Sequence, residues 1–78
     1  MIATDDLKPI IGANIRRLRE SLGLSQGELA GRAGCHWVNI NRIENGHVAP
    51  GAALLYSLAD ALGVSADSLR QACEKKSR

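Results

Sequence analysis

The chain has 78 residues, of which 45% are hydrophobic and 23% charged, and its formal net charge is +2 at pH 7. This length suffices for one domain with one core, and this composition excludes both intrinsic disorder and a membrane-embedded fold. No apolar run approaches the roughly 20 residues that cross a bilayer, and the start, "MIATDDLKPI", is acidic where a secretory signal is basic. We expect a soluble, cytoplasmic protein.

The charge is unevenly distributed along the chain, which permits a polyanionic partner without proving one. Residues 8–47 hold six Lys or Arg against three acids, and residues 74–78 form a basic tail. Cys35 and Cys73 form no recognisable disulfide framework, which favours a reducing compartment. We predict an arm at residues 1–7, a domain at 8–73 and the tail at 74–78.

The first predicted helix carries apolar residues spaced i, i+4, i+7 and i+11, namely Ile11, Ile15, Leu18 and Leu22. Its stop is "LGLS", in which Gly23 can adopt a left-handed conformation and Leu24 can fold back on the last turn. Ser25 and Glu28 then form a capping box. The same punctuation returns as "LGVS" at residues 62–65, so helices should start near residues 26 and 66.

Two further helices are predicted between these signals. One runs from about residue 36 to residue 45 and stops at Gly46. The other follows Pro50 and places Leu55, Leu58, Ala59 and Leu62 on one face. No stretch shows the alternation of a β-strand, so the sequence predicts an all-α domain of five short helices.

A helix-turn-helix signature covers about residues 26–45, "QGELAGRAGCHWVNINRIEN". Ala30 is small where two helices would touch, and Gly34 stands where the turn needs a positive φ angle. The apolar contacts between the helices should come from Leu29, Cys35, Ile40 and Ile43.

With its flanks "IRRLRESLGLSQGELA", "RIENG" and "LADALGVSADSL", the chain resembles the Cro/CI-type helix-turn-helix family, also called XRE-like or lambda-repressor-like, over about residues 9–70. The resemblance implies five helices and double-stranded DNA as the partner. It implies that the third helix lies in the major groove, and that a symmetric dimer binds two half-sites one helical turn apart.

The sequence departs from the family pattern where the third helix begins. The family usually has a small hydroxyl residue as the cap and polar residues after it, but here stand His36, Trp37 and Val38. Histidine is a poor N-cap, so we expect a poorly satisfied helix end that costs about 1 kcal/mol relative to serine.

Base-reading residues should project from the outer face of the third helix. With Ile40 and Ile43 turned inward, the outward set is Trp37, Val38, Asn41 and Arg42, with His36 just before them. Arg42 can pair with guanine and Asn41 with adenine, and the two apolar side chains fit a thymine methyl. The alternatives are that Trp37 folds over the second helix or packs at a subunit contact, and that Arg42 is a solvated charge.

Phosphate contacts are predicted mainly at Gln26, which resembles the family's glutamine at the start of the second helix. Weaker candidates are Asn39, Asn45, His47 and Arg17. Ordinary loop polarity is the alternative, and for Asn45 the alternative is a role at the C-terminus of the helix. If a dimer neutralises about six phosphates, log affinity should fall with log salt at a slope near −5. The resemblance also pairs Arg19 with Glu44 as a structural ion pair, whose loss would cost about 3 to 5 kcal/mol if it is deeply buried.

Metal-dependent and catalytic roles are not expected. Cys35, His36, His47 and Cys73 match the ligand count of a zinc site but lack its paired short spacings. No glycine-rich phosphate loop, paired catalytic carboxylates or cofactor motif appears, so we expect no cofactor and no enzyme.

A sequence-specific transcriptional regulator is therefore predicted, with repression by steric exclusion of polymerase as its simplest mechanism. A homodimer interface is expected at exposed Leu54 and Tyr56. Two alternatives stay open: an antitoxin that binds a toxin through the same scaffold, and an activator of the restriction-modification controller type that contacts RNA polymerase.

Overall fold

The structure, a computed structural model, describes residues 4–71 and contains five helices. They are α1 (Thr4–Ser21), α2 (Gln26–Ala33), α3 (Trp37–Glu44), α4 (Ala52–Leu62) and α5 (Ala66–Arg70). No strand occurs between residues 4 and 71, and the predicted all-α fold is confirmed. Helix α1 begins inside the segment predicted as an arm, whereas the predicted basic tail and Cys73 lie outside the described residues.

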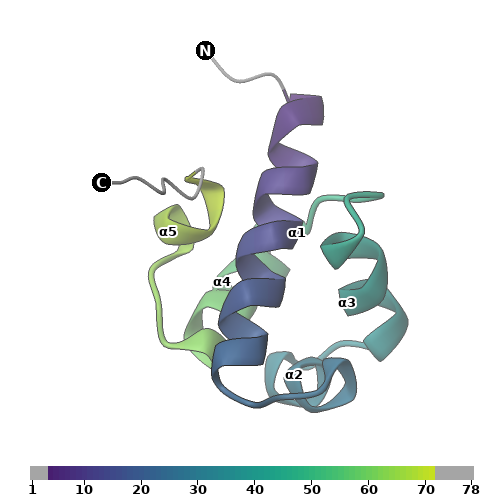
Figure 1. The fold of residues 1–78 in the computed structure, drawn as a ribbon, viewed down its shortest axis with the longest axis vertical. Coiled ribbons are helices and arrows are strands. Elements are labelled where there is room, and N and C mark those ends of the chain that lie inside the picture. The colour runs from purple at the N-terminus through teal and green to yellow at the C-terminus, as the bar shows by residue number, and fades with distance from the viewer. Residues whose placement is uncertain (1–3, 72–78) are drawn as a thin grey trace.

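Helix α1 is the longest element and the others surround it (Figure 1). Helix α3 lies on one side of it, α5 on the other, and α2 crosses near its C-terminal end. Helices α2 and α3 pack against each other, and α4 packs against α1, α2 and α5. This arrangement leaves one long face of α3 without a helical neighbour in the described part of the chain.

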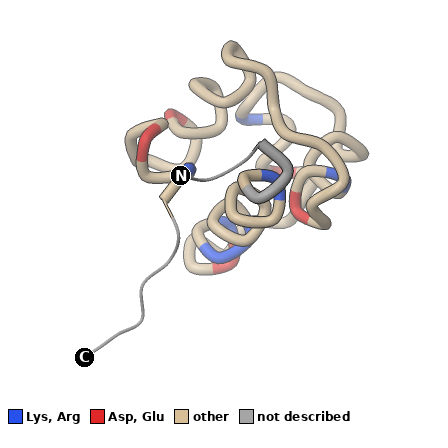
Figure 2. The backbone as a smooth tube through the Cα atoms, turned by 90° about the horizontal axis from the view of Figure 1, so that it is seen from above, with Lys and Arg blue, Asp and Glu red and all other residues tan. Residues whose placement is uncertain are grey.

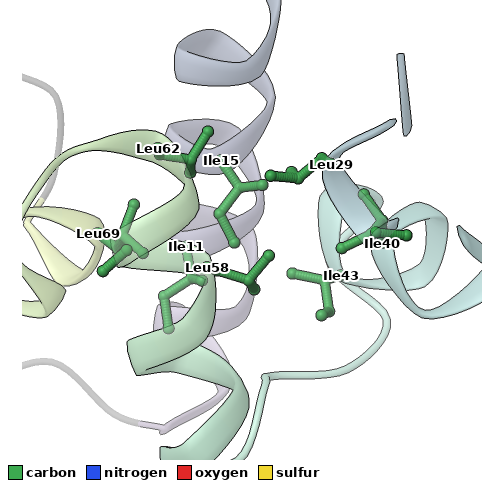
Figure 3. Close-up of a cluster of buried hydrophobic side chains, with 10 residues drawn as sticks. Ile11, Ile15, Leu29, Ile40, Ile43, Leu58, Leu62 and Leu69 are labelled. Atoms are coloured by element: carbon green, nitrogen blue, oxygen red, sulfur yellow. The ribbon is translucent and has the colours of Figure 1, made fainter. Parts of the chain in front are cut away.

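One hydrophobic core joins all five helices (Figure 3). Its fully buried aliphatic side chains are Ile15, Leu29, Ile40, Ile43, Leu58 and Leu69. Burying one such side chain contributes about 1.5 to 3 kcal/mol, so the core supplies the main stabilisation of this small domain. The predicted inward faces of the first and fourth helices are confirmed at Ile11, Ile15, Leu58, Ala59 and Leu62.

Leu22 was wrongly predicted to lie on the buried face of the first helix. Its side chain is 52% exposed, because α1 ends at Ser21 and the chain turns away at Gly23, whose φ is +72°. Leu24 folds back and takes the buried position instead, with its amide bonded to Arg19 O at 3.1 Å. The apolar spacing therefore extends to Leu22, one residue beyond the end of α1.

The predicted caps and turns are present. Ser25 Oγ accepts a hydrogen bond from the Glu28 amide at 3.0 Å, and Glu28 Oε1 accepts one from the Ser25 amide at 2.8 Å. Gly34 and Gly63 end α2 and α4 with positive φ angles of 77° and 74°. Ser65 caps α5 by accepting from the Ser68 amide at 3.2 Å.

A buried polar residue, Asn14, was not anticipated from the sequence. It is 2% exposed, and its Nδ2 donates to Leu69 O at 2.8 Å and Gln71 O at 2.7 Å. These carbonyls lie at the end of α5, where no further helical turn supplies donors. Asn14 therefore attaches the short α5 to α1 by hydrogen bonds.

A second unanticipated feature is the close approach of α1 to the end of α3 at Gly12. A Cβ atom at this position would collide with the carbonyl oxygens of Ile43 and Glu44. The absence of a side chain therefore lets α1 lie directly against the backbone of α3.

Candidate nucleic-acid interface

The helix-turn-helix unit consists of α2, a short turn and α3. Ala30 is buried where the two helices meet, and its carbonyl accepts a hydrogen bond from the Cys35 amide at 2.9 Å. Gly34 makes the turn with φ +77°. Cys35 is partly buried against the core, and burial raises the pKa of its thiol. Its environment fits a packing role rather than a nucleophile.

The two faces of α3 differ sharply in exposure. Ile40 and Ile43 point into the core (Figure 3). On the outer side, Trp37 is 52% exposed, Val38 is 38% exposed, and Arg42 is exposed. An amphipathic helix with this outer face can enter a wide groove without disturbing the core.

The first turn of α3 is capped by a histidine. His36 Nδ1 accepts a hydrogen bond from the Val38 amide at 3.3 Å, so the helix end expected to be poorly satisfied has a cap, although a longer one than the 3.0 Å cap at Ser25. The imidazole reaches the amide because the His36 backbone is extended, with φ −85° and ψ 144°. Its ring also stacks on Trp37, with centroids 6.2 Å apart and an interplanar angle of 28°. The exposed start of α3 thus presents two adjacent aromatic rings.

An ion pair ties α1 to the end of α3. Arg19 Nε lies 2.7 Å from Glu44 Oε2 and Nη2 lies 3.1 Å from Oε1, a two-pronged geometry. The third arm, Nη1, donates to Leu24 O at 2.7 Å. The side chains are 12% and 2% exposed, and the hydrogen bond to Glu44 raises the pKa of Arg19. Two charges so well satisfied can remain buried and hold the angle of α3.

A chain of hydrogen bonds extends from this ion pair to the surface. Gln26 Nε2 donates to Glu44 Oε1 at 3.1 Å, and Asn41 Nδ2 donates to Gln26 Oε1 at 3.3 Å. Asn45 Nδ2 in turn donates to Asn41 Oδ1 at 3.2 Å. We call Gln26, Asn41 and Asn45 the amide chain. It brings together two predicted phosphate-contact residues and one predicted base-reading residue.

The remaining predicted site residues are dispersed. Asn39 and His47 are exposed on and after α3, and Arg17 on α1 donates to Asn14 Oδ1 at 3.4 Å. Tyr56 is 64% exposed on α4. Leu54, which was predicted to be exposed, is partly buried against the core because its position on α4 turns it inward.

Basic positions occur on several elements around α1 and are interspersed with acidic ones (Figure 2). Arg16 is paired with Glu20 at 3.2 Å, one turn along α1. The α3 surface instead carries Arg42, for which no ion pair appears among residues 4–71. On the α3 surface, the positive charge that can meet an anion is therefore the guanidinium group of Arg42.

Within the described residues, no cluster of three or more His, Cys, Asp or Glu is arranged to hold a metal ion. No helix in that part of the chain is long and apolar enough to span a membrane.

Comparison with known proteins agrees with this geometry. The family model of the helix-turn-helix domain matches residues 10–72. A curated relative, the uncharacterized HTH-type transcriptional regulator y4dJ of Sinorhizobium fredii, is 40% identical over 60 residues that cover 77% of this chain and 78% of the relative. The chain belongs to the helix-turn-helix domain family, and the predicted resemblance is confirmed.

Solved structures show the same fold. The P22 c2 repressor, in complex with a synthetic operator, aligns with a TM-score of 0.77 and 30% identity over 81% of this chain and 96% of that one. The restriction-modification controller protein C.AhdI of Aeromonas hydrophila aligns with a TM-score of 0.75 and 30% identity over 78% and 92%. The relatives are regulators, and the prediction that this chain is not an enzyme is confirmed.

Proposed function

We propose that the protein is a sequence-specific transcriptional regulator that inserts α3 into the major groove of DNA. The observation that carries this proposal is the outer face of α3, where Trp37, Val38 and Arg42 are exposed on a helix whose inner face is fixed in the core. The similarity to a repressor solved in complex with a synthetic operator supports DNA as the partner.

Direct base contacts are assigned to the three exposed side chains. Arg42 can donate two parallel hydrogen bonds to guanine O6 and N7, which contributes about 1 to 3 kcal/mol of discrimination against other bases. Val38 lies one helical turn before Arg42 on the same side of α3, so an apolar contact to a thymine methyl would fall near that guanine. Trp37 and His36 extend the surface at the start of the helix.

Phosphate contact is assigned to the start of α2. The capping box uses the Glu28 amide, and within the described chain no acceptor is bonded to the amides of Gln26 and Gly27. These two N–H groups lie at the positive end of the α2 dipole, and the Gln26 side chain at the same helix start contacts α3. A phosphate of the strand that borders the groove fits this set.

The active species is proposed to be a homodimer on an inverted repeat, because two linked half-sites multiply the affinity of one small domain. Exposed Tyr56 on α4 is the contact residue that we assign, while Leu54 contributes mainly to the core. Repression by occupancy of the promoter is the proposed action. The similarity to a controller protein favours activation as the second candidate.

The test is selection of bound sequences from random duplexes, followed by affinity measurements on the selected site. We expect an inverted repeat, and we expect Arg42→Ala to flatten the preference for one base pair in each half-site. Gln26→Ala should weaken binding to all duplexes alike. A promoter–reporter assay then distinguishes repression from activation. Equal binding of both variants and the parent to every duplex would reject the assigned roles.

A further inference from the structure

The amide chain defined above has a fixed direction that starts at the buried carboxylate. Glu44 can only accept hydrogen bonds, so Gln26 must turn its NH₂ group toward it. The Gln26 carbonyl then faces α3, where Asn41 must present its own NH₂ group. Asn41 Oδ1 is left to accept from Asn45. The charge of one buried residue therefore sets the orientation of three side-chain amides in sequence.

This direction constrains the role predicted for Asn41. Bidentate recognition of adenine needs an Asn side chain that offers both its oxygen and an N–H to the base edge. Here one N–H and one oxygen lone pair of Asn41 are already engaged within the protein, at 3.3 Å and 3.2 Å. The second N–H and the second lone pair would have to meet a base in the orientation that these two partners fix. Asn41 is also only partly exposed, on the side of α3 that faces Gln26 rather than on the outermost side with Val38 and Arg42.

From these contacts we infer that Asn41 is a positioning residue for Gln26 and not a reader of bases. By donating to Gln26 Oε1, it holds the Gln26 amide with its remaining Nε2 hydrogen available beside the free amides at the start of α2. The inference rests on the proposed phosphate contact of Gln26. It adds that Asn41 on α3 orients the Gln26 side chain on α2. The proposed phosphate contact and the helix proposed to enter the groove therefore keep a fixed orientation relative to each other.

The experiment combines Asn41→Ala, Gln26→Ala and the double variant, with Asp60→Ala on the exposed side of α4 as the control. Affinity is measured on the selected duplex and on duplexes with 7-deaza-adenine at each adenine in turn. We expect Asn41→Ala to weaken binding about two- to tenfold, the effect of one lost hydrogen bond, on all duplexes alike. The double variant should bind no more weakly than Gln26→Ala.

Two results would overturn the positioning role. One is a change in base preference, or loss of a 7-deaza-adenine penalty, in Asn41→Ala. The other is a double variant whose loss is the product of the two single losses. In the DNA-free protein, Asn41→Ala should also shift the Gln26 side-chain amide resonances, and unchanged resonances would contradict the contact. A parent protein that binds no duplex would instead reject the proposed function, and the inference with it.

Discussion

The inner and outer faces of α3 differ in burial and in the number of partners that each side chain has. The inner face holds Ile40 and Ile43 in the core and Glu44 in a buried ion pair, so each side chain has several fixed partners. The outer face holds Trp37 and Arg42 in solvent, with a ring contact to His36 as the nearest support for the indole. One eight-residue helix therefore carries the folding contacts on one face and the proposed DNA contacts on the other.

This separation means that substitutions on α3 should fall into two classes. Changes on the inner face should unfold the domain, whereas changes on the outer face should alter binding at nearly constant stability. The domain should therefore tolerate substitutions on the outer face of α3, including at the aromatic residues where α3 begins, provided that the contacts of the inner face remain.

The largest effect is expected for Glu44→Ala. It leaves the Arg19 guanidinium buried without its partner and frees the Gln26 amide, so the free energy of unfolding should fall by about 3 to 5 kcal/mol. Urea denaturation followed by circular dichroism measures this. Asp67→Ala, which removes the exposed pair with Arg70 at 3.2 Å and does not touch Arg19, is the matched control and should cost less than about 1 kcal/mol.

Gly12→Ala should produce the next largest loss, about 1 to 3 kcal/mol, because the added Cβ must push α1 away from the backbone of α3. Gly31→Ala is the control, since it lies inside α2 with open space around its Cα. That change should stabilise the domain by about 0.4 to 1 kcal/mol. Thermal unfolding of both variants compares them, and equal destabilisation would contradict the close approach.

The two helix starts offer a smaller contrast. Ser25→Ala breaks one direction of the capping box at α2 and should cost about 1 kcal/mol. His36→Ser exchanges a 3.3 Å imidazole cap on α3 for a shorter hydroxyl cap and should be neutral or slightly stabilising. Chemical denaturation of both variants is the measurement, and a large loss in His36→Ser would show that the ring contact with Trp37 matters more than the cap.

Acidification should weaken the α2 cap. Hydrogen bonds from the Ser25 backbone and hydroxyl hold the pKa of Glu28 below its ordinary value near 4.5. Since the folded pKa is the lower one, this contribution is present above about pH 4.5 and is lost as the pH falls through the folded pKa. The parent should be more stable than Glu28→Gln at pH 7, with a gap that closes on acidification. A gap independent of pH between 7 and 3 would refute it.

The smallest stability effect is expected for Trp37→Ala, within about 0.5 kcal/mol, because half of the indole is already exposed. Binding to the selected duplex should nevertheless weaken. Calorimetric unfolding and duplex affinity measured on the same sample give both values. A stability loss comparable to that of Glu44→Ala would place Trp37 in the folding class.

Local signals in the sequence predicted most of the fold. The capping box at Ser25, the glycine stop at Gly34 and the apolar spacing around Ile40 each depend on a few neighbouring residues, and the structure contains them all. Leu22 was placed wrongly because periodicity does not mark where a helix ends. Gly12 and Asn14 were missed, since their roles depend on α3 and α5 approaching α1 from distant parts of the chain.

The candidate site was predictable to a smaller extent. Exposure of Trp37 and Arg42 followed from helical geometry once the inward face was known. The amide chain did not, because side-chain orientation depends on hydrogen-bond partners from two helices. In the sequence, an Asn on the helix that is proposed to meet DNA is predicted to read bases, and only its hydrogen-bond partners in the structure indicate another role.

The chain has a single tryptophan, and it stands at the start of α3, so its fluorescence reports directly on that position. The most direct test is titration of the protein with the selected duplex while Trp37 emission and the anisotropy of labelled DNA are followed together. We predict that the emission changes in proportion to binding, with both signals weakening as salt is raised. Binding without any change in Trp37 emission would contradict insertion of this face of α3 into the groove.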